Sequence, residues 1–333
     1  MFNKNIFKVW SFEVPIISVG NLSFGGTGKT PQVEYLIRLL SGTFQVATLS
    51  RGYKRKSRGF VEASLTSLSS EIGDEPRQYK TKFPEVHVTV CEERCKGVLE
   101  ILKINKDMDC ILLDDAFQHR SIKPGLSILL TDYNKLYFND DVVPSGTLRE
   151  FRCGAGRADI IIVTKCPVKI SLQERKNLCE KIHPALHQSV FFSFIDYGPF
   201  TRISDPTEIK PMDQNTAVLL FSGIANSEPL IDYLLENKVE TVVMKFPDHH
   251  QYSKDDLIKV RESFNNIATQ NKLIITTEKD AMRIESHDQM DILKGLPVYF
   301  IPVFTNFFPS NKEMFNKIIF DYVTNARKNQ RNN

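Results

Sequence analysis

Short apolar runs alternate along the chain with segments whose apolar residues recur every three or four positions. The runs, which are typical of buried strands, lie at 14–19, 44–49, 86–90, 110–113, 126–130 and 159–163. Helical spacing follows several of them, beginning with Val33, Leu36, Ile37 and Leu40 after the first run. Because strands that alternate with helices favour a parallel sheet with helices on both faces, the pattern predicts an α/β fold.

The alternation is interrupted around residues 190–211, where an aromatic strand at 191–194 precedes a stretch without helical spacing. It then restarts with apolar runs at 217–221, 241–245 and 273–275. Since 333 residues exceed what one hydrophobic core comfortably serves, we predict two domains, 1–198 and a smaller α/β domain at 199–333. We expect the basic, Asn-rich residues 327–333 to fray.

Composition narrows the classes of protein that remain. The net charge of +3 is too small to suggest nucleic-acid binding, so we expect no nucleic-acid partner. The six cysteines have no framework of paired spacings and are expected to be reduced thiols of a cytosolic protein. No apolar stretch approaches 18 residues and no signal-peptide pattern opens the chain, so we expect no membrane span.

A Gly-rich segment separates the first predicted strand from the first predicted helix. It reads Ser23-Phe24-Gly25-Gly26-Thr27-Gly28-Lys29-Thr30. In this context backbone N–H groups and the positive end of the helix bind phosphate oxygens, Lys29 reaches the β/γ-phosphates, and Thr30 offers a hydroxyl to Mg²⁺. Ser23 replaces the usual first Gly, but Gly25 and Gly26 supply flexibility nearby. The segment predicts a nucleotide triphosphate site, with an ordinary Gly-rich turn as the alternative.

Charged side chains follow the other predicted strands. Asp114 and Asp115 end the strand at 110–113, where enzymes with a phosphate-binding loop hold Mg²⁺, and either can serve. Arg149 can neutralise charge that develops on a transferred phosphate. Five of the eight residues at 51–58 are basic, which indicates either a solvated face or a loop that faces phosphate or anionic lipid.

Phosphoryl transfer also needs a group that receives the proton of the acceptor. Asp74, before a predicted helix, and His249, after the strand at 241–245, are the natural pair, because a carboxylate can orient an imidazole and stabilise its protonated form. Two alternatives stay open for His249. It is either an ordinary polar histidine or, with Asp248 and His250, a metal ligand.

Two other classes of nucleotide-binding protein can be weighed from the same motifs. A GTPase is disfavoured, because residues 114–117 and 164–167 lack the D-x-x-G and N-K-x-D patterns. An ATPase switch that acts on a protein or metal partner remains the alternative, since residues 25–30 resemble its loop. Phe24 stands where that class has its signature lysine.

Together these motifs resemble the tetraacyldisaccharide 4'-kinase family, the lipid A 4'-kinases of the Gram-negative envelope. The matching segments follow the family order at 19–31, 50–53, 73–76, 114–120, 146–150, 221–225, 248–250 and 277–281. The resemblance implies transfer of the ATP γ-phosphate to the 4'-hydroxyl of a tetraacylated glucosamine disaccharide 1-phosphate. The product would be lipid IV-A, on the route to lipopolysaccharide.

The resemblance also implies roles for single residues. Asp74 and His249 would be the catalytic pair, with Lys29 and Arg149 beside the phosphates. Thr30, Asp114, Asp115 and Glu150 would lie near Mg²⁺, and the further active-site groups would be Glu75, Arg94 and His119. In the family's fold a two-stranded linker joins two α/β domains that close over the nucleotide, which would bring His249 to Asp74.

Membrane attachment is the point at which the chain departs from the family. Members usually carry a hydrophobic or amphipathic helix before the first strand, and here little precedes Phe12. Either the start is truncated or attachment relies on other surfaces, such as the basic residues 51–58, while residues 1–10 could lie at an interface. We expect a peripheral monomer at the cytoplasmic face of the bacterial inner membrane.

Overall fold

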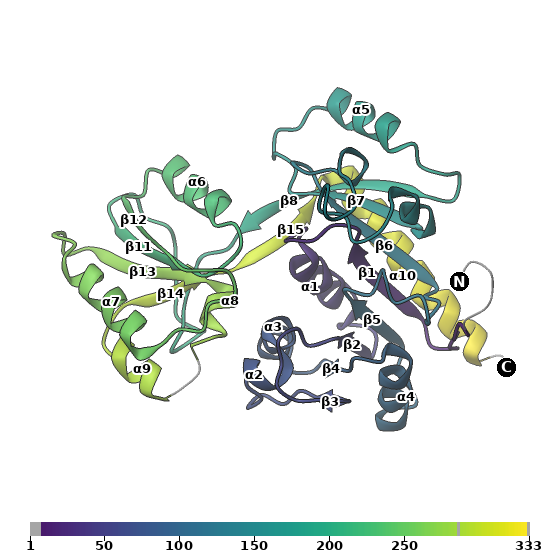
Figure 1. The fold of residues 1–333 in the computed structure, drawn as a ribbon, viewed down its shortest axis with the longest axis horizontal. Helices are drawn as coiled ribbons and strands as arrows, with labels where there is room; N and C mark the ends of the chain where they lie inside the picture. The colour runs from purple at the N-terminus through teal and green to yellow at the C-terminus, as the bar shows by residue number, and fades with distance from the viewer. Residues whose placement is uncertain (1–7, 285–286, 332–333) are drawn as a thin grey trace. The chain divides into compact units, whose positions relative to one another are not determined.

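The computed structural model describes residues 8–284 and 287–331, and these form two compact units (Figure 1). The first unit takes in the described residues up to Asp196 and from Phe304 onward, and the second unit is Tyr197–Val303. The chain leaves the first unit along one strand and returns along a neighbouring one. The predicted second domain, 199–333, is therefore wrong for the described residues from 304 to 331.

The first unit is built on a mostly parallel sheet. In the described residues its nine strands have the order β15-β8-β7-β6-β1-β5-β2-β4-β3. They are β1 (Ile16–Asn21), β2 (Val46–Ser50), β3 (Val61–Glu62), β4 (His87–Val90), β5 (Cys110–Asp114), β6 (Leu126–Asp132), β7 (Ile160–Thr164), β8 (Ser189–Tyr197) and β15 (Val303–Phe307). The strands from β4 to β8 in this order pair in parallel, and β3 pairs antiparallel at the edge. The predicted α/β class is confirmed.

Helices cover both faces of this sheet. One face carries α1 (Lys29–Leu40), α3 (Asp74–Lys82) and α10 (Pro309–Arg331), and the other carries α4 (Arg94–Ile104) and α5 (Leu172–Ile182). A short helix, α2 (Ser69–Ile72), precedes α3, and two 3₁₀ turns lie at Tyr137–Asn139 and Arg152–Arg157. Alternate side chains of each strand enter opposite cores, as period-two geometry requires. Ile17 packs with α1, whereas Ile16 packs with α4.

The C-terminal helix α10 explains why residues 304–331 join the first unit (Figure 1, yellow). Phe315, Ile319 and Val323 recur every four positions, so they form one helical face, and each is 0% exposed in the core of that unit. The helix continues to Arg331, and Arg327 Nε lies 2.8 Å from Asp109 Oδ1. Residues 327–331 are therefore helical, whether their end frays stays a prediction, and residues 332–333 lie outside the described chain.

The second unit has a smaller sheet with the order β10-β9-β14-β13-β11-β12 in its described residues. The strands are β9 (Phe200–Arg202), β10 (Ile209–Lys210), β11 (Ala217–Ser222), β12 (Thr241–Lys245), β13 (Lys272–Thr277) and β14 (Val298–Ile301). The helices are α6 (Glu228–Glu236), α7 (Lys254–Asn265), α8 (Glu278–Ala281) and α9 (His287–Leu293). The last four strands in this order pair in parallel, and α6 and α7 pack in the cores on opposite faces.

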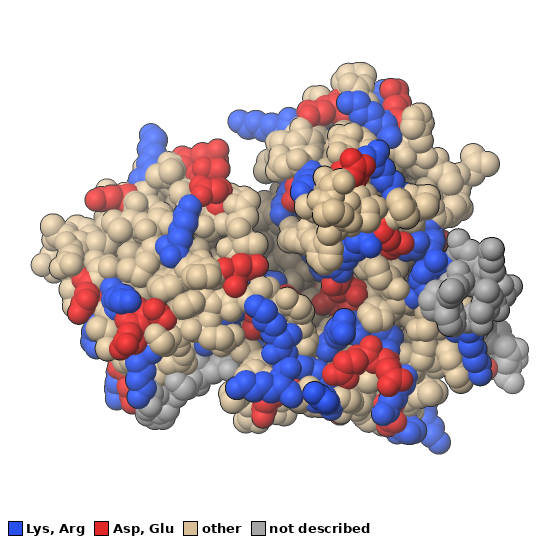
Figure 2. All heavy atoms as spheres, viewed as in Figure 1, with Lys and Arg blue, Asp and Glu red and all other residues tan. Residues whose placement is uncertain are grey.

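The distribution of surface charge and the state of the cysteines agree with what the composition indicates. On the face drawn in Figure 2, basic and acidic side chains are intermixed. All six cysteines are free thiols, as predicted. Across residues 8–284 and 287–331, none of the helices combines the length and the hydrophobicity that a membrane crossing needs. The predicted interfacial segment 1–10 lies mostly outside the described residues.

Candidate active site

The phosphate-binding loop lies between β1 and α1, as the sequence predicts. Gly25 and Gly28 have φ angles of 106° and 84°, in the left-handed region that favours glycine. Two side chains, from the ends of β1 and β7, anchor Thr27. Asn21 Nδ2 donates to its hydroxyl at 2.8 Å, and Thr164 Oγ1 donates to its carbonyl at 2.8 Å. The loop therefore leads directly into the N-terminus of α1, where backbone N–H groups can bind an anion.

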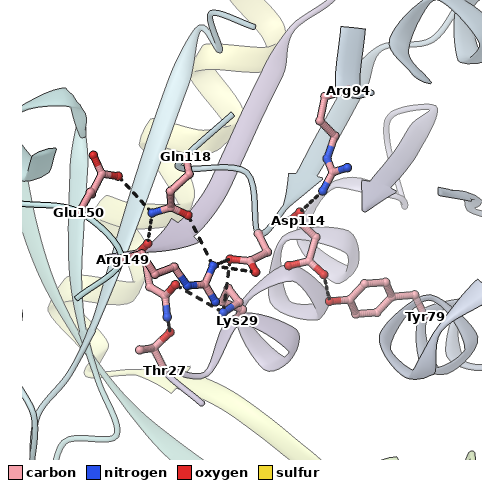
Figure 3. Close-up of polar contacts among 10 residues, drawn as sticks. Thr27, Lys29, Tyr79, Arg94, Asp114, Gln118, Arg149 and Glu150 are labelled. Carbon is pink, nitrogen blue, oxygen red and sulfur yellow. Dashed lines mark hydrogen bonds and ion pairs between the residues drawn. The ribbon is translucent and has the colours of Figure 1, made fainter. Parts of the chain in front are cut away.

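A network of paired charges lies beside this loop (Figure 3). Lys29 Nζ is 3.4 Å from Asp115 Oδ1, and Arg149 Nη1 donates to both carboxylate oxygens of Asp115 at 2.9 and 3.0 Å. Burial alone would raise the pKa of Asp115, but the charges of Lys29 and Arg149 outweigh burial and lower it. Gln118 Nε2 extends the network by donating to Glu150 Oε1 at 3.1 Å. The sequence-predicted Lys29, Asp115, Arg149 and Glu150 are thus brought together.

Asp114 occupies a different environment from its neighbour. Its side chain is buried at the end of β5, where Tyr79 Oη donates to Oδ2 at 3.0 Å and Oδ1 has no hydrogen-bond partner. Burial, with the nearby charges of Asp115 and Glu75, raises the pKa of Asp114 to about 6. A buried carboxylate oxygen without a partner is costly unless a cation or a proton satisfies it.

Arg94 lies behind the strand end rather than at an open surface. It is 1% exposed, and it donates to the main-chain carbonyls of Cys91 at 2.5 Å and Asp114 at 3.4 Å. Burial lowers the pKa of Arg94 to about 10. Partly buried His119 follows β5, and burial together with the charges of Arg94 and Arg51 lowers its pKa to about 4. His119 is therefore neutral at neutral pH.

The residues around Asp114 fit Mg²⁺. The candidate oxygen donors of the loop and the nearby strand ends are the unpartnered Asp114 Oδ1, the buried Thr30, Asp115, and Glu150, which also pairs with Arg157. In the described part of the chain no group of three or more His, Cys, Asp or Glu side chains forms a ready metal cage. Mg²⁺ typically uses only one or two carboxylates together with water and substrate phosphates. The alternative of a metal site at 248–250 finds no support.

The segment at 146–150 reaches the loop by a pairing that sequence reasoning missed. Ser23 forms an antiparallel bridge with Leu148, Phe24 N donates to Thr147 O at 2.7 Å, and Arg149 N donates to Leu22 O at 2.6 Å. The Arg149 guanidinium lies 5.1 Å from the centroid of the exposed Phe24 ring. This pairing holds Arg149 beside the loop. In the sequence, the motif at 146–150 was the only indication that this segment belongs to the site.

Asp74 and His249 belong to different units. Asp74 is buried in the first turn of α3, where the positive end of the helix favours a carboxylate, and Glu75 follows it. His249 follows β12 in the second unit with a φ of 59°, and its N–H donates to Gly223 O at 3.0 Å. Arg283 Nη2 lies 3.2 Å from its Nδ1.

A family model described as Tetraacyldisaccharide-1-P 4'-kinase matches residues 1–323. The chain belongs to this family. The motif-based prediction of the tetraacyldisaccharide 4'-kinase family, and with it of an ATP-dependent kinase, is confirmed.

Relatives of this family match almost the whole chain. The Tetraacyldisaccharide 4'-kinase of Flavobacterium johnsoniae is 44% identical over 328 residues, covering 97% of this chain and 91% of the relative. That of Phocaeicola vulgatus is 40% identical over 337 residues, covering 100% of this chain and 91% of the relative. The fold is similar to a crystal structure described as the "apo" form of LpxK from Aquifex aeolicus in complex with ATP. The TM-score is 0.72 at 29% identity, covering 97% of this chain and 92% of that one.

Proposed function

We propose that this chain transfers the γ-phosphate of ATP to the 4'-hydroxyl of a tetraacylated glucosamine disaccharide 1-phosphate, a step of lipid A biosynthesis. The observation that carries the proposal is the loop at 25–30 with Lys29 and Arg149 paired beside the acidic end of β5, in a member of this family. Phosphoryl transfer depends mainly on positioning and on positive charge near the transferred group, and this arrangement supplies both.

The loop residues bind and orient the donor. Backbone N–H groups at 25–30 hold the phosphates. When ATP binds, Lys29 and Arg149 release the carboxylate of Asp115 and bind phosphate oxygens instead. Thr30, Asp114, Asp115 and Glu150 are the residues that would hold Mg²⁺, which neutralises charge on the β- and γ-phosphates when bound.

The acceptor requires a second set of residues. As the oxygen of the 4'-hydroxyl bonds to the γ-phosphorus, its O–H bond breaks and the bond from that phosphorus to the leaving ADP oxygen breaks. Asp74 with His249 receives the proton. The exposed basic residues at 51–58, which do not include Arg55 because its side chain is buried, provide attachment to an anionic membrane surface, where the chain acts as a monomer.

An assay with ATP and the acylated disaccharide 1-phosphate tests this function, with the lipid product identified by mass spectrometry and phosphorus NMR. We expect one phosphate to be added at the 4'-position for each ATP consumed. ATP turnover without a 4'-phosphorylated lipid would contradict the kinase and favour an ATPase switch.

Two substitutions test the proposed catalytic pair. Asp74→Ala and His249→Ala should each lower turnover by about 10²–10⁴-fold, the usual contribution of a positioned acid or base, while ATP still binds. Asp107→Ala and His87→Ala are matched controls, because Asp107 is exposed and His87 pairs with Glu62 at the edge of the first sheet. Wild-type turnover in both test variants would remove the pair.

A further inference from the structure

A buried ion pair lies at the carboxyl edge of the second unit's sheet, next to His249. Asp280 and Arg283 are both 0% exposed, and Arg283 Nη1 is 2.8 Å from Asp280 Oδ1. Removing two charges from water is costly, and such a pair persists only where further hydrogen bonds satisfy both groups. The remaining partners of the pair therefore indicate what it holds in place.

Among the further partners of the pair are the backbone of Gly223 and the side chain of Thr277. Asp280 Oδ2 accepts from Gly223 N at 3.0 Å and from Thr277 Oγ1 at 2.6 Å, while Arg283 Nη1 donates to Gly223 O at 2.8 Å. The same carbonyl accepts the backbone N–H of His249 at 3.0 Å. The ion pair thus fixes the turn to which the backbone of His249 is bonded.

The second contact of Arg283 reaches the imidazole itself. Arg283 Nη2 lies 3.2 Å from His249 Nδ1, and a guanidinium can only donate hydrogen bonds. Nδ1 must therefore accept, so in the neutral ring the proton resides on Nε2, which is 4.0 Å from Asp248 Oδ2. His249 also has a φ of 59°, which is uncommon for a residue other than glycine and persists only where the surroundings enforce it.

We infer that Arg283 is a positioning residue that fixes the orientation of His249 and its Nε2–H tautomer, and that Asp280 holds Arg283 in place. The inference rests on the proposed role of His249. It specifies that His249 presents an Nε2–H donor to the carboxylate of the proposed pair, so that Asp74 is the group that receives the proton of the acceptor. Neither Asp280 nor Arg283 contacts substrate in this account.

The tautomer can be measured independently of activity. In the full-length protein labelled with ¹⁵N-histidine, the signal of His249 is assigned by its loss in His249→Ala. The wild type should show an unprotonated Nδ1 and a protonated Nε2. In Arg283→Met we expect a mixture of tautomers and a kcat roughly 10–100-fold lower, the usual range for a residue that orients a functional histidine. The KM for ATP should not change, because the phosphate-binding loop belongs to the other unit.

Arg261→Met is the matched control, since Arg261 bonds to the carbonyl of Ile292 at 2.8 Å in the same unit and has no contact with His249. It should keep the wild-type tautomer and kcat. Arg283→Lys should fold even if Arg283→Met does not. It should lower kcat, because one ammonium does not reproduce the planar fork that reaches both Gly223 O and His249 Nδ1.

Three outcomes separate the claims. A folded Arg283→Met or Arg283→Lys variant with the wild-type tautomer and kcat overturns the inference. A changed tautomer with wild-type kcat confirms that Arg283 fixes the tautomer and overturns its expected contribution to turnover. If His249→Ala itself turns over at the wild-type rate, the proposed role of His249 fails, whatever Arg283 does.

Discussion

The two sheets of this chain end in polar edges that handle charge differently. In the first unit, the side chains of Lys29, Asp115 and Arg149 are 17%, 37% and 22% exposed. In the second unit, Asp280 and Arg283 are 0% exposed. Partly exposed pairs contribute little to stability, so a ligand can replace one partner at low cost. A buried pair cannot be opened without leaving a charge unsatisfied.

This difference indicates two kinds of site. At the first edge, cations are held near the phosphate-binding loop by a carboxylate that phosphate oxygens can replace. At the second edge, the buried ion pair is hydrogen-bonded to one turn and to one imidazole. The first edge is suited to reversible binding of a charged ligand. The second edge is suited to holding one side chain in a fixed geometry.

Each edge also belongs to a unit with its own hydrophobic core, and the core of the first unit can be tested through α10. Phe315→Ala should destabilise the first unit by about 3–5 kcal/mol, because it removes a fully buried aromatic side chain. Urea unfolding followed by the fluorescence of Trp10, the single tryptophan and a residue of the first unit, measures this directly.

Phe264→Ala is the matched control, since Phe264 is 6% exposed in the core of the second unit. It should leave the midpoint of the Trp10 transition unchanged. A Trp10 midpoint that does not move in Phe315→Ala would mean that α10 contributes nothing to the first core. A midpoint that moves equally in both variants would mean that the two units unfold as one.

The second-largest effect is expected on turnover, from the loss of a cation that binds phosphate at the first edge. Lys29→Met should lower kcat by about 10²–10³-fold, the range measured when one group that stabilises developing charge is removed. Steady-state kinetics with ATP and the lipid acceptor measure it, and Lys103→Met is the control, because Lys103 pairs with Glu100 on an exposed helix surface. Wild-type turnover in Lys29→Met would mean that Lys29 serves only as a partner of Asp115.

The sequence predicted the elements of both units better than their assembly. Strands such as β1 and β5 are buried on both faces, so they read as mostly apolar runs rather than as alternating patterns. The return of α10 to the first unit was missed, because an apolar face such as that of Phe315 and Ile319 does not say which core it joins. Only tertiary packing decides this.

For the candidate site, too, the sequence predicted the local motifs but not how they are packed together. The phosphate-binding loop and the paired aspartates were predicted, because their residue types follow from the chemistry of phosphate and Mg²⁺. Which aspartate is buried was not predictable, since it depends on Tyr79 and Arg94, which approach β5 from α3 and α4. The contact between Arg283 and His249 was also missed, because it joins residues 34 positions apart through a turn.

The crowding of carboxylates at the first edge predicts a smaller effect, on the pKa of Asp114. Burial first, and the charge of Asp115 second, raise this pKa to about 6. The folded chain therefore binds a proton at Asp114 between about pH 4 and 6 that the unfolded chain has released, since an unperturbed Asp titrates near 4. The contribution of Asp114 to the free energy of unfolding thus falls as the pH rises through this window.

Asp115→Asn should lower the pKa of Asp114, because it removes the second-largest cause and leaves the positive charge of Lys29 uncompensated. Carbon-13 NMR of the Asp114 carboxyl, recorded in metal-free protein from pH 4 to 8, measures the shift. Asp107→Asn, at an exposed site, should leave the titration unchanged. If Asp115→Asn leaves it unchanged as well, burial and Glu75 raise the pKa of Asp114 without a contribution from Asp115. The two aspartates then titrate independently, although both lie at the same edge of the sheet.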